Sequence, residues 1–543
     1  MLYEENITLK SLDDIDVRFG LIYPDVYENV NLSTGFELLY HMLNDRNDCY
    51  CERFIYPHTK SLETKSSLKK FDIISFTIHH TDAFFKIIEI LKKADIPILR
   101  ENRTNDDPLI IIGGPITTSN PAPLSKFIDI FCIGEGECIL NKLIDKFKKF
   151  ENPKEHLKEF LDIQGVYIPK FNNHTKIALI DNMDEKFHNT NPIIVKNEDN
   201  EIVNTIRLDV LRGCSHGCRF CMAGYLYKPS RETSLEKLIE IAEEARENTG
   251  ITSVFLVGPD IADHSRFIEL IDELNKRNFN VGLPSIRIEK ISRKMLQDLK
   301  DSGTNSFDIA PESIHKIRIS LNKDFTDDKI DYVMKNAFDM GFNLKFLFLI
   351  GFPQETNEDI VDLAKYIKSI IKTRDNFDKN LELDFRVSPA VPKAHTPLQW
   401  HQFDMDLINY KIDVLLEELN DLNLECIGET MMGITYTNYS INLRFDFNSN
   451  ENCLKDYILS CGNSDVGDLI MNHSFNSPLS KWEKYIPKYD LDDELPWDCI
   501  DLGYRKGFIK AEYKRMLKNK LTLWCGENKC YNCKDNCFKN DFI

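Results

Sequence analysis

Residues 1–150 alternate short apolar runs with stretches in which apolar residues recur at helical spacing. The helical stretches cover residues 32–43 and 84–91, and the apolar runs cover 17–23, 71–78, 109–112 and 128–133. Short apolar strands that are followed by turns and helices predict a doubly wound parallel sheet, Rossmann-like or flavodoxin-like. The chain is therefore expected to be an α/β protein whose first domain covers residues 1–150.

The carboxyl edge of this predicted sheet is where a ligand is expected, because ligands of such sheets bind beyond the carboxyl ends of the strands. We interpret the two histidines at this edge as ordinary strand-end residues, and its glycines are also explained by simple turns. The edge carries Tyr23, Asp25, His79, His80, Gly113, Gly114, Gly134 and Gly136.

Residues 205–400 contain six further strand-and-helix units, which we take as the core of the protein. The strands are predicted at 206–210, 254–257, 281–286, 307–309, 344–350 and 383–388. Asparagines and a charged run mark residues 151–204 as a connector with a β extension. Residues 401–524 are expected to form a mixed α+β region, and residues 525–543 a cysteine-rich tail.

The composition narrows the possible classes of function. A length of 543 residues suggests three or four domains. The net charge of −19 argues against a broad nucleic-acid surface. The amino-terminal residues lack the pattern of a signal peptide, and no run of 18 apolar residues occurs. Fifteen cysteines in such a chain indicate metal ligands and reduced thiols, and hence a cytoplasmic protein.

Three cysteines, Cys214, Cys218 and Cys221, form a C-x3-C-x2-C motif. Thiolates are soft ligands that suit iron–sulfur clusters, zinc or copper(I). A complete cubane site normally uses four cysteines, so three indicate a cluster with one iron open to a substrate. Zinc is the alternative, since His216 lies inside the loop and would complete four ligands.

The motif resembles that of the radical S-adenosylmethionine (SAM) superfamily, in which an aromatic residue precedes the last cysteine, as Phe220 does here. The resemblance implies a [4Fe–4S] cluster whose free iron chelates SAM and whose electron cleaves it to a 5′-deoxyadenosyl radical. It also implies that the six units form a partial (β/α)6 barrel similar to that of triose-phosphate isomerase, with the chemistry at the carboxyl ends of its strands.

Other turns resemble SAM-binding segments of the same superfamily. Gly258-Pro259-Asp260 stands where the family has a Gly-Gly-Glu-like turn for the SAM amino group, although Pro259 has no N–H. Glu312 resembles a residue near the SAM ribose. Arg287 suits the SAM carboxylate, because guanidinium groups bind carboxylates in bidentate fashion; a surface salt bridge is the alternative.

Residues 1–150 resemble the cobalamin-binding domain that precedes many radical SAM cores. The resemblance rests on Gly113-Gly114-Pro115, Asn120-Pro121 and the turn at Gly134. The Asp-x-His-x-x-Gly signature, whose histidine ligates cobalt in many cobalamin proteins, is absent, and Asp25 occupies the corresponding loop. Asp25, Gly113, Gly114 and Gly134 are the candidate cobalamin residues; a degenerate domain that only packs on the core is the alternative.

The tail ends in a second group of cysteines: Cys525, Cys530, Cys533 and Cys537. Four cysteines within so short a segment predict a metal site, either a tetrahedral zinc site or a second iron–sulfur cluster.

The resemblance implies a radical SAM enzyme that uses a ferredoxin or flavodoxin as its electron donor. With cobalamin bound, methyl transfer to an unactivated centre is the leading reaction, on a small molecule or protein rather than RNA, because the chain is acidic. The alternatives are another radical SAM reaction, such as sulfur insertion or rearrangement, and a non-enzymatic electron carrier. Because the barrel carries its own ligands, deletion of residues 1–150 is expected to spare cluster assembly.

Overall fold

The amino-terminal domain is a six-stranded sheet in the order β3-β2-β4-β5-β6-β7. In the computed structural model all neighbouring strands are parallel except β6 and β7. The strands are β2 (Val17–Tyr23), β3 (Cys49–Ile55), β4 (Ile73–Thr77), β5 (Leu109–Gly113), β6 (Ile130–Cys132) and β7 (Val166–Tyr167). The doubly wound parallel sheet predicted from the sequence is confirmed.

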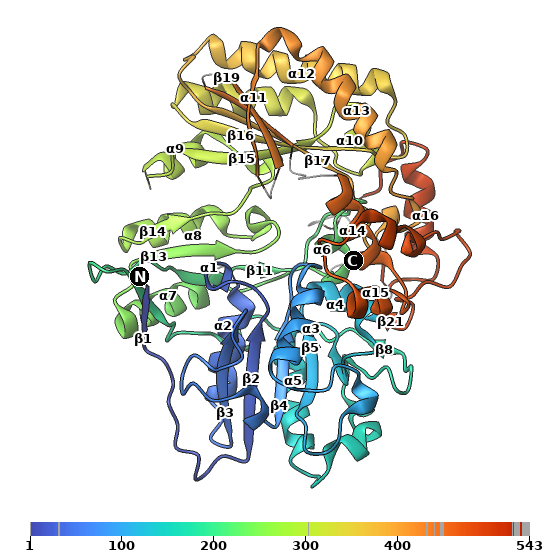
Figure 1. The fold of residues 1–543 in the computed structure, drawn as a ribbon. Coiled ribbons are helices and arrows are strands. Elements are labelled where there is room, and N and C mark those ends of the chain that lie inside the picture. Colours follow the sequence, from blue (N-terminus) through green and yellow to red (C-terminus); the bar gives the residue numbers. More distant parts are fainter. Residues whose placement is uncertain are drawn as a thin grey trace.

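Helices cover both faces of this sheet. One of the two faces also belongs to a hydrophobic cluster that the sheet shares with the rest of the protein. Alternate residues of the strands belong to two separate buried clusters, as a strand with both faces covered requires. The α-helices of this domain are α1 (Tyr27–Val30), α2 (Thr34–Asn44), α3 (Ala83–Lys93), α4 (Pro115–Ser119) and α5 (Gly136–Phe147). The domain forms the lower part of Figure 1.

The core contains the six predicted parallel strands, in two groups. The first group is ordered β10-β13-β14, and the second begins β15-β16-β17. The strands are β10 (Ile206–Asp209), β13 (Ser253–Val257), β14 (Asn280–Gly282), β15 (Ser306–Glu312), β16 (Asn343–Ile350) and β17 (Leu383–Pro389). Figure 1 shows β13 and β14 in the middle of the molecule and β15, β16 and β17 above them, as expected for a partial barrel.

Helices follow these strands in sequence and cover the core. Thr356 begins the longest of them with a capping box that uses Asp359. The helices are α6 (Met222–Leu226), α7 (Leu235–Thr249), α8 (Phe267–Lys276), α9 (Arg293–Asp301), α10 (His315–Ser320), α11 (Asp327–Asp339), α12 (Asn357–Asp375) and α13 (Met405–Glu418).

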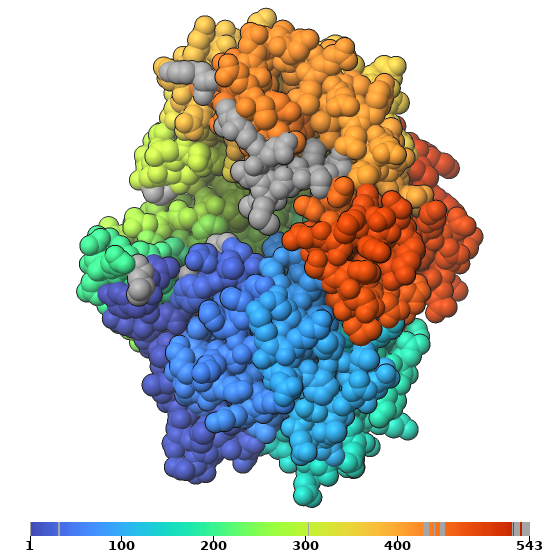
Figure 2. All heavy atoms as spheres, in the orientation of Figure 1, coloured from blue at the N-terminus to red at the C-terminus, as the bar shows by residue number. Residues whose placement is uncertain are grey.

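The carboxyl-terminal region extends the core and then returns to the amino-terminal domain. Strand β20 (Ile441–Phe445) pairs in parallel with β17, and β19 (Gly433–Asn438) and β18 (Glu425–Thr430) continue the sheet. The last helices, α14 (Asn450–Cys461), α15 (Val466–Asn472) and α16 (Phe508–Met516), lie beside both domains, where Figure 2 shows them in orange-red next to the blue domain. Lys126 and Asp468 form an ion pair of 2.6 Å across this contact.

Small pairings complete the secondary structure. They join β1 (Tyr3–Glu5) to β9 (Ile194–Lys196), β11 (Leu211–Arg212) to β12 (Arg231–Glu232), and β8 (Thr175–Lys176) to β21 (Ile500–Asp501). The structure describes all residues except 1, 31–32, 302, 431–432, 439, 446–449, 524, 526–532 and 535–543. Among the described residues, no helix is both long and apolar enough to cross a membrane.

Candidate functional site

The three cysteines of the 214–221 loop lie close together as free thiols. Cys218 is buried, and Cys214 and Cys221 are partly buried. Burial raises the pKa of the Cys214 thiol far above its usual value, and its neighbours Cys218 and Cys221 raise it further. Metal binding replaces the protons of such thiols. Three thiolates at one place fit an iron–sulfur cluster that leaves one iron open to another ligand.

One buried ammonium group, that of Lys228, is hydrogen-bonded to the backbone of this loop. The loop starts after β11 at Gly213, whose φ is 73°, and leads into α6. A Cβ at Gly213 would lie 2.1 Å from the carbonyl oxygen of Tyr227, so only glycine fits there. Lys228 Nζ donates to the carbonyl oxygens of Cys214, Ser215 and His216 at 2.7, 3.1 and 2.8 Å. These bonds fix the curvature of the loop.

A second buried cation connects the loop to the carboxyl-terminal region. Arg219 and Glu512 are both fully buried, and Arg219 Nη2 lies 3.1 Å from Glu512 Oε2. Arg219 also donates to the carbonyl oxygens of Ser320 and Lys520, each at 2.7 Å. The Cys525 N–H donates to the Ser215 carbonyl oxygen at 3.1 Å. Residues beyond 500 therefore contribute directly to the support of the cluster loop.

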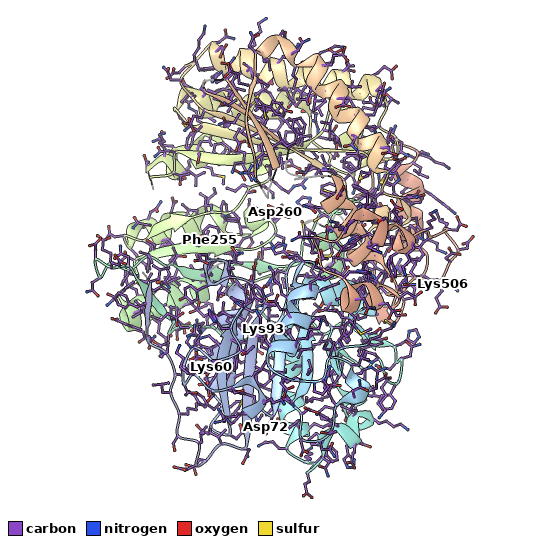
Figure 3. The ribbon with its side chains drawn as sticks, viewed as in Figure 1. Lys60, Asp72, Lys93, Phe255, Asp260 and Lys506 are labelled. Carbon is purple, nitrogen blue, oxygen red and sulfur yellow. The ribbon has the colours of Figure 1, made fainter. Side chains whose placement is uncertain are left out.

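The turn after β13 brings a carboxylate to the loop, as the sequence predicted for Asp260. Asp260 Oδ2 lies 3.0 Å from His216 Nε2, which is also 3.0 Å from Asp263 Oδ2. Burial raises the pKa of the Asp260 carboxyl. Burial would lower the pKa of His216, but the hydrogen bonds that its imidazole donates to the two carboxylates raise it overall. Figure 3 shows Asp260 in the middle of the molecule, between the upper strands of the core and the amino-terminal domain.

Arg287 lies in the same place, and its side chain is mostly buried. Its Nη1 lies 3.5 Å from Cys218 Sγ, and its Nε lies 3.7 Å from Asp260 Oδ2. Its other amino group contacts Glu289. A guanidinium group beside both a cluster thiol and Asp260 is placed to bind a carboxylate next to the cluster.

Glu312 and Phe220 lie near Cys221, the last cysteine of the loop. Glu312 has a φ of 63°, and its carboxylate accepts from Lys323 Nζ at 2.6 Å. It is close enough to Cys221 to raise the pKa of that thiol, which burial already raises. Phe220 packs against Phe352, with the ring centroids 6.2 Å apart. The structure thus gathers Phe220, Asp260, Arg287 and Glu312 around the three cysteines.

A cavity of about 450 Å³ lies between the carboxyl edge of the amino-terminal sheet and the base of the cluster loop. The sheet side includes the predicted Gly113, Gly114 and Gly134, and the core side includes the predicted Gly258. Seven of its lining residues are glycines, which let a large ligand approach the backbone closely: Gly35, Gly113, Gly114, Gly134, Gly136, Gly213 and Gly258. Its volume is typical of ligand pockets, which span about 300–1,000 Å³.

Asp25 does not line this cavity, whereas His79 does. Asp25 forms an ion pair of 2.8 Å with Lys86 and accepts from Asn29. Burial lowers the pKa of His79 to about 4, so its imidazole is neutral at neutral pH. The sequence analysis selected Asp25 as a candidate cobalamin residue and interpreted His79 as an ordinary strand-end residue, whereas the structure places His79 at the cavity.

The metal site predicted for the tail stays a prediction. Cys525 is partly buried and Cys533 is buried, while Cys530 and Cys537 lie outside the described residues. Both described thiols lie near the hydroxyl of Tyr504. Burial raises the pKa of this hydroxyl far above its usual value, and the two thiols raise it further. The described part of the tail contacts the cluster loop, where the Cys525 N–H donates to the Ser215 carbonyl oxygen.

Comparison with known proteins identifies the class to which this fold and site belong. The description "Radical SAM proteins, N-terminal" matches residues 35–169, and "Radical SAM superfamily" matches residues 208–367. The chain belongs to the radical SAM superfamily. Membership implies a [4Fe–4S] cluster and SAM, which the three cysteines and their polar surroundings fit.

Two curated relatives extend the similarity. The chain is 27% identical over 399 residues to an uncharacterized protein of Methanocaldococcus jannaschii, covering 70% of this chain and 83% of the relative. It is 25% identical over 315 residues to an uncharacterized methyltransferase of Pyrococcus horikoshii, covering 56% of this chain and 66% of the relative.

Among solved structures, the radical SAM methyltransferase TsrM from Kitasatospora setae is similar with a TM-score of 0.47 and 12% identity, covering 69% of this chain and 73% of that one. The cobalamin-dependent SAM radical enzyme OxsB is similar with a TM-score of 0.44 and 14% identity. The similarity covers 75% of this chain and 56% of the OxsB chain. Likeness of this size leaves the substrate and the cofactors open.

Proposed function

We propose that this radical SAM enzyme binds cobalamin between its two domains and methylates an unactivated centre of its substrate. The cavity at the sheet edge is the observation that carries the proposal, because it opens between the candidate cobalamin glycines and the residues that lead into the cluster loop. The similarity to an uncharacterized methyltransferase supports the same reaction class. The enclosed volume suits the ring of a corrinoid, and the rest of the molecule requires the open side of the cavity.

When bound, the cluster would supply the electron that cleaves one SAM molecule, and cobalamin would supply a methyl group that it receives from a second SAM molecule. The residues of this chain would bind SAM and orient it beside the cluster. Arg287 would bind the carboxylate of SAM. The carboxylate of Asp260, which contacts His216, would accept a hydrogen bond from the amino group of SAM. Glu312, held by Lys323, is placed for the ribose hydroxyls. Lys228 and Arg219 keep the loop rigid while the ligands change.

A substitution that fills the cavity tests the proposal directly. Gly35 lines the cavity near the start of α2, and a Cβ built there has no atom within 4 Å. The Gly35→Trp variant is expected to lose retention of cobalamin after reconstitution with hydroxocobalamin and desalting, because the indole takes the ligand's space. Its iron content and its formation of 5′-deoxyadenosine from SAM are expected to stay unchanged.

Gly35→Ala is the matched control, because it adds only the Cβ and is expected to retain cobalamin like the wild type. Retention by the Trp variant would contradict this location. A wild-type protein that cleaves SAM but retains no corrinoid would favour another radical SAM reaction, such as sulfur insertion. That alternative is represented among the curated relatives by ribosomal protein uS12 methylthiotransferases, one of them 24% identical over 177 residues.

A further inference from the structure

Helix α16 and the residues that flank it form a basic surface on an acidic chain. Residues 505–520 carry seven cationic side chains and one acid, whereas the whole chain has a net charge of −19. That acid, Glu512, is fully buried and adds no negative charge to the exposed surface. A local excess of positive charge attracts negatively charged partners. The cationic residues are Arg505, Lys506, Lys510, Lys514, Arg515, Lys518 and Lys520.

Three of these side chains form a stripe on the outer side of α16. Lys514, Arg515 and Lys518 are exposed, and their spacing of three and four residues places them side by side on a helical surface. Arg515 pairs with Glu512 at 2.6 Å, but Lys514 and Lys518 form no ion pair within the described part of the chain. Figure 1 shows α16 at the right-hand edge of the molecule, and Figure 3 shows Lys506, just before it, near the same edge. We call Lys514, Arg515 and Lys518 the basic stripe.

The inner side of the same helix touches the cluster loop. Arg219, which lies between Cys218 and Cys221, contacts Glu512 at 3.1 Å. Phe220 packs against the hydrophobic cluster that contains Met516 of α16. An α-helix with its side chains is about 10–12 Å across, so roughly one helix thickness separates the basic stripe from the cluster loop.

Exposed apolar side chains lie next to the stripe in the sequence. Leu517, Leu521 and Leu523 are 41%, 39% and 59% exposed. Complexes that transfer electrons bury small interfaces, and complementary charges steer the partners together. A small apolar surface beside a charged one suits a transient contact of this kind.

We propose that the basic stripe and these leucines are the docking surface of an acidic electron-carrier protein that reduces the cluster. One electron passes from the reduced carrier to the cluster for each SAM that is cleaved, so the carrier is oxidised by one electron and no atom is transferred. RNA would also be attracted by a basic stripe, but the acidity of the whole chain and the contact of α16 with the cluster loop favour a redox protein. The proposal rests on membership of the radical SAM superfamily and is independent of cobalamin.

Binding measured with a charge-reversed variant tests the surface. The anaerobically reconstituted full-length protein is titrated with the flavodoxin and the ferredoxin encoded in the same genome, at low and at high salt. The Lys514→Glu/Lys518→Glu variant is expected to bind the physiological carrier about tenfold more weakly or worse, because electrostatic steering of this size is lost. High salt is expected to weaken wild-type binding in the same way. Its iron content and its formation of 5′-deoxyadenosine with dithionite as reductant are expected to equal those of the wild type.

Lys142→Glu/Lys149→Glu is the matched control. Both lysines are exposed on α5 or directly after it, and the double substitution changes the net charge by the same amount. This variant is expected to keep wild-type affinity for the carrier. Equal affinity of the two variants, or a wild-type protein that binds neither carrier, would overturn the proposal. So would a stripe variant that loses binding of a labelled RNA oligonucleotide and keeps that of the carrier, because the stripe would then be an RNA surface.

Discussion

Gly213 is the residue at which the cluster loop depends most on a missing side chain. Its φ of 73° is the left-handed region, and a Cβ would lie 2.1 Å from the Tyr227 carbonyl oxygen. Gly213→Ala is therefore expected to lose most of the iron bound per chain after reconstitution, because the loop must move away from the backbone segment between α6 and β12.

Gly250 provides the control for that prediction. It ends α7 with a φ of 76°, but a Cβ there has no atom within 4 Å. Gly250→Ala bears the same backbone cost of about 1–2 kcal/mol in the free energy of unfolding, without the clash. Iron content and thermal unfolding of both variants separate the two effects. Equal iron in the two variants would show that the close approach at Gly213 is unimportant.

The sequence was enough to select candidate ligands residue by residue, but not the groups that support them. Cysteine spacing and short turn motifs identified Cys214, Cys218 and Cys221, and also Asp260, Arg287 and Glu312. The supporting roles of Lys228 and Arg219 and the contacts of His216 are set by the carbonyl and carboxylate groups that lie nearby in space. Spacing along the chain carries no information about these neighbours. The contrast between Asp25, paired with Lys86, and His79, facing the cavity, has the same origin.

At the scale of elements, helix α16 acts as a support for the cluster loop. It places Glu512 against Arg219, and neither side chain is exposed. Glu512→Gln removes the negative charge and keeps the shape, which leaves a buried guanidinium without its counter-ion. The cost in the free energy of unfolding is expected to be about 3–5 kcal/mol. Chemical denaturation measures it, and iron content after reconstitution is expected to fall in parallel.

Asp95→Asn is the comparison for that variant. Asp95 pairs with Lys69 at 2.7 Å on the surface, where solvent screens the interaction, so no measurable change is expected. If Glu512→Gln is as stable as Asp95→Asn and binds full iron, α16 does not support the loop.

Strand β3 is the element that the hydrophobic pattern did not reveal. Its sequence places Glu52 and Arg53 side by side, which reads as a polar stretch, yet both are buried. Arg53 pairs with Glu4 and Glu63 at 2.6 and 2.7 Å, and Glu52 accepts from the Thr64 hydroxyl at 2.6 Å. Long-range partners make the strand compatible with burial, and those partners are visible only in the fold.

On the scale of the molecule, the two domains depend on each other. Arg212, at the start of the cluster loop, pairs with Glu137 at 2.8 Å, and the buried Arg231 pairs with Glu135 at 2.9 Å. One hydrophobic cluster contains residues from the sheet of the first domain, from the core and from α14 and α15. This shared interior could not be predicted from the sequence, because each domain has its own periodic pattern.

Deletion of residues 1–150 is therefore expected to impair cluster assembly, contrary to the expectation from the sequence. The deletion leaves Arg212 and Arg231 without their carboxylates and exposes the apolar surface of the core. Iron content and the oligomeric state of the truncated chain check this. A monodisperse truncated protein with full iron content would show that the core is independent.

The central claim is that SAM is used in two ways at one site between the domains. Quantification of nucleoside products tests it most directly: the anaerobically reconstituted protein, with cobalt and iron measured after desalting, is incubated with SAM, reductant and hydroxocobalamin. The account predicts stoichiometric retained cobalt, with both 5′-deoxyadenosine and S-adenosylhomocysteine as products. Formation of 5′-deoxyadenosine alone, by a protein that retains iron and no cobalt, would contradict it.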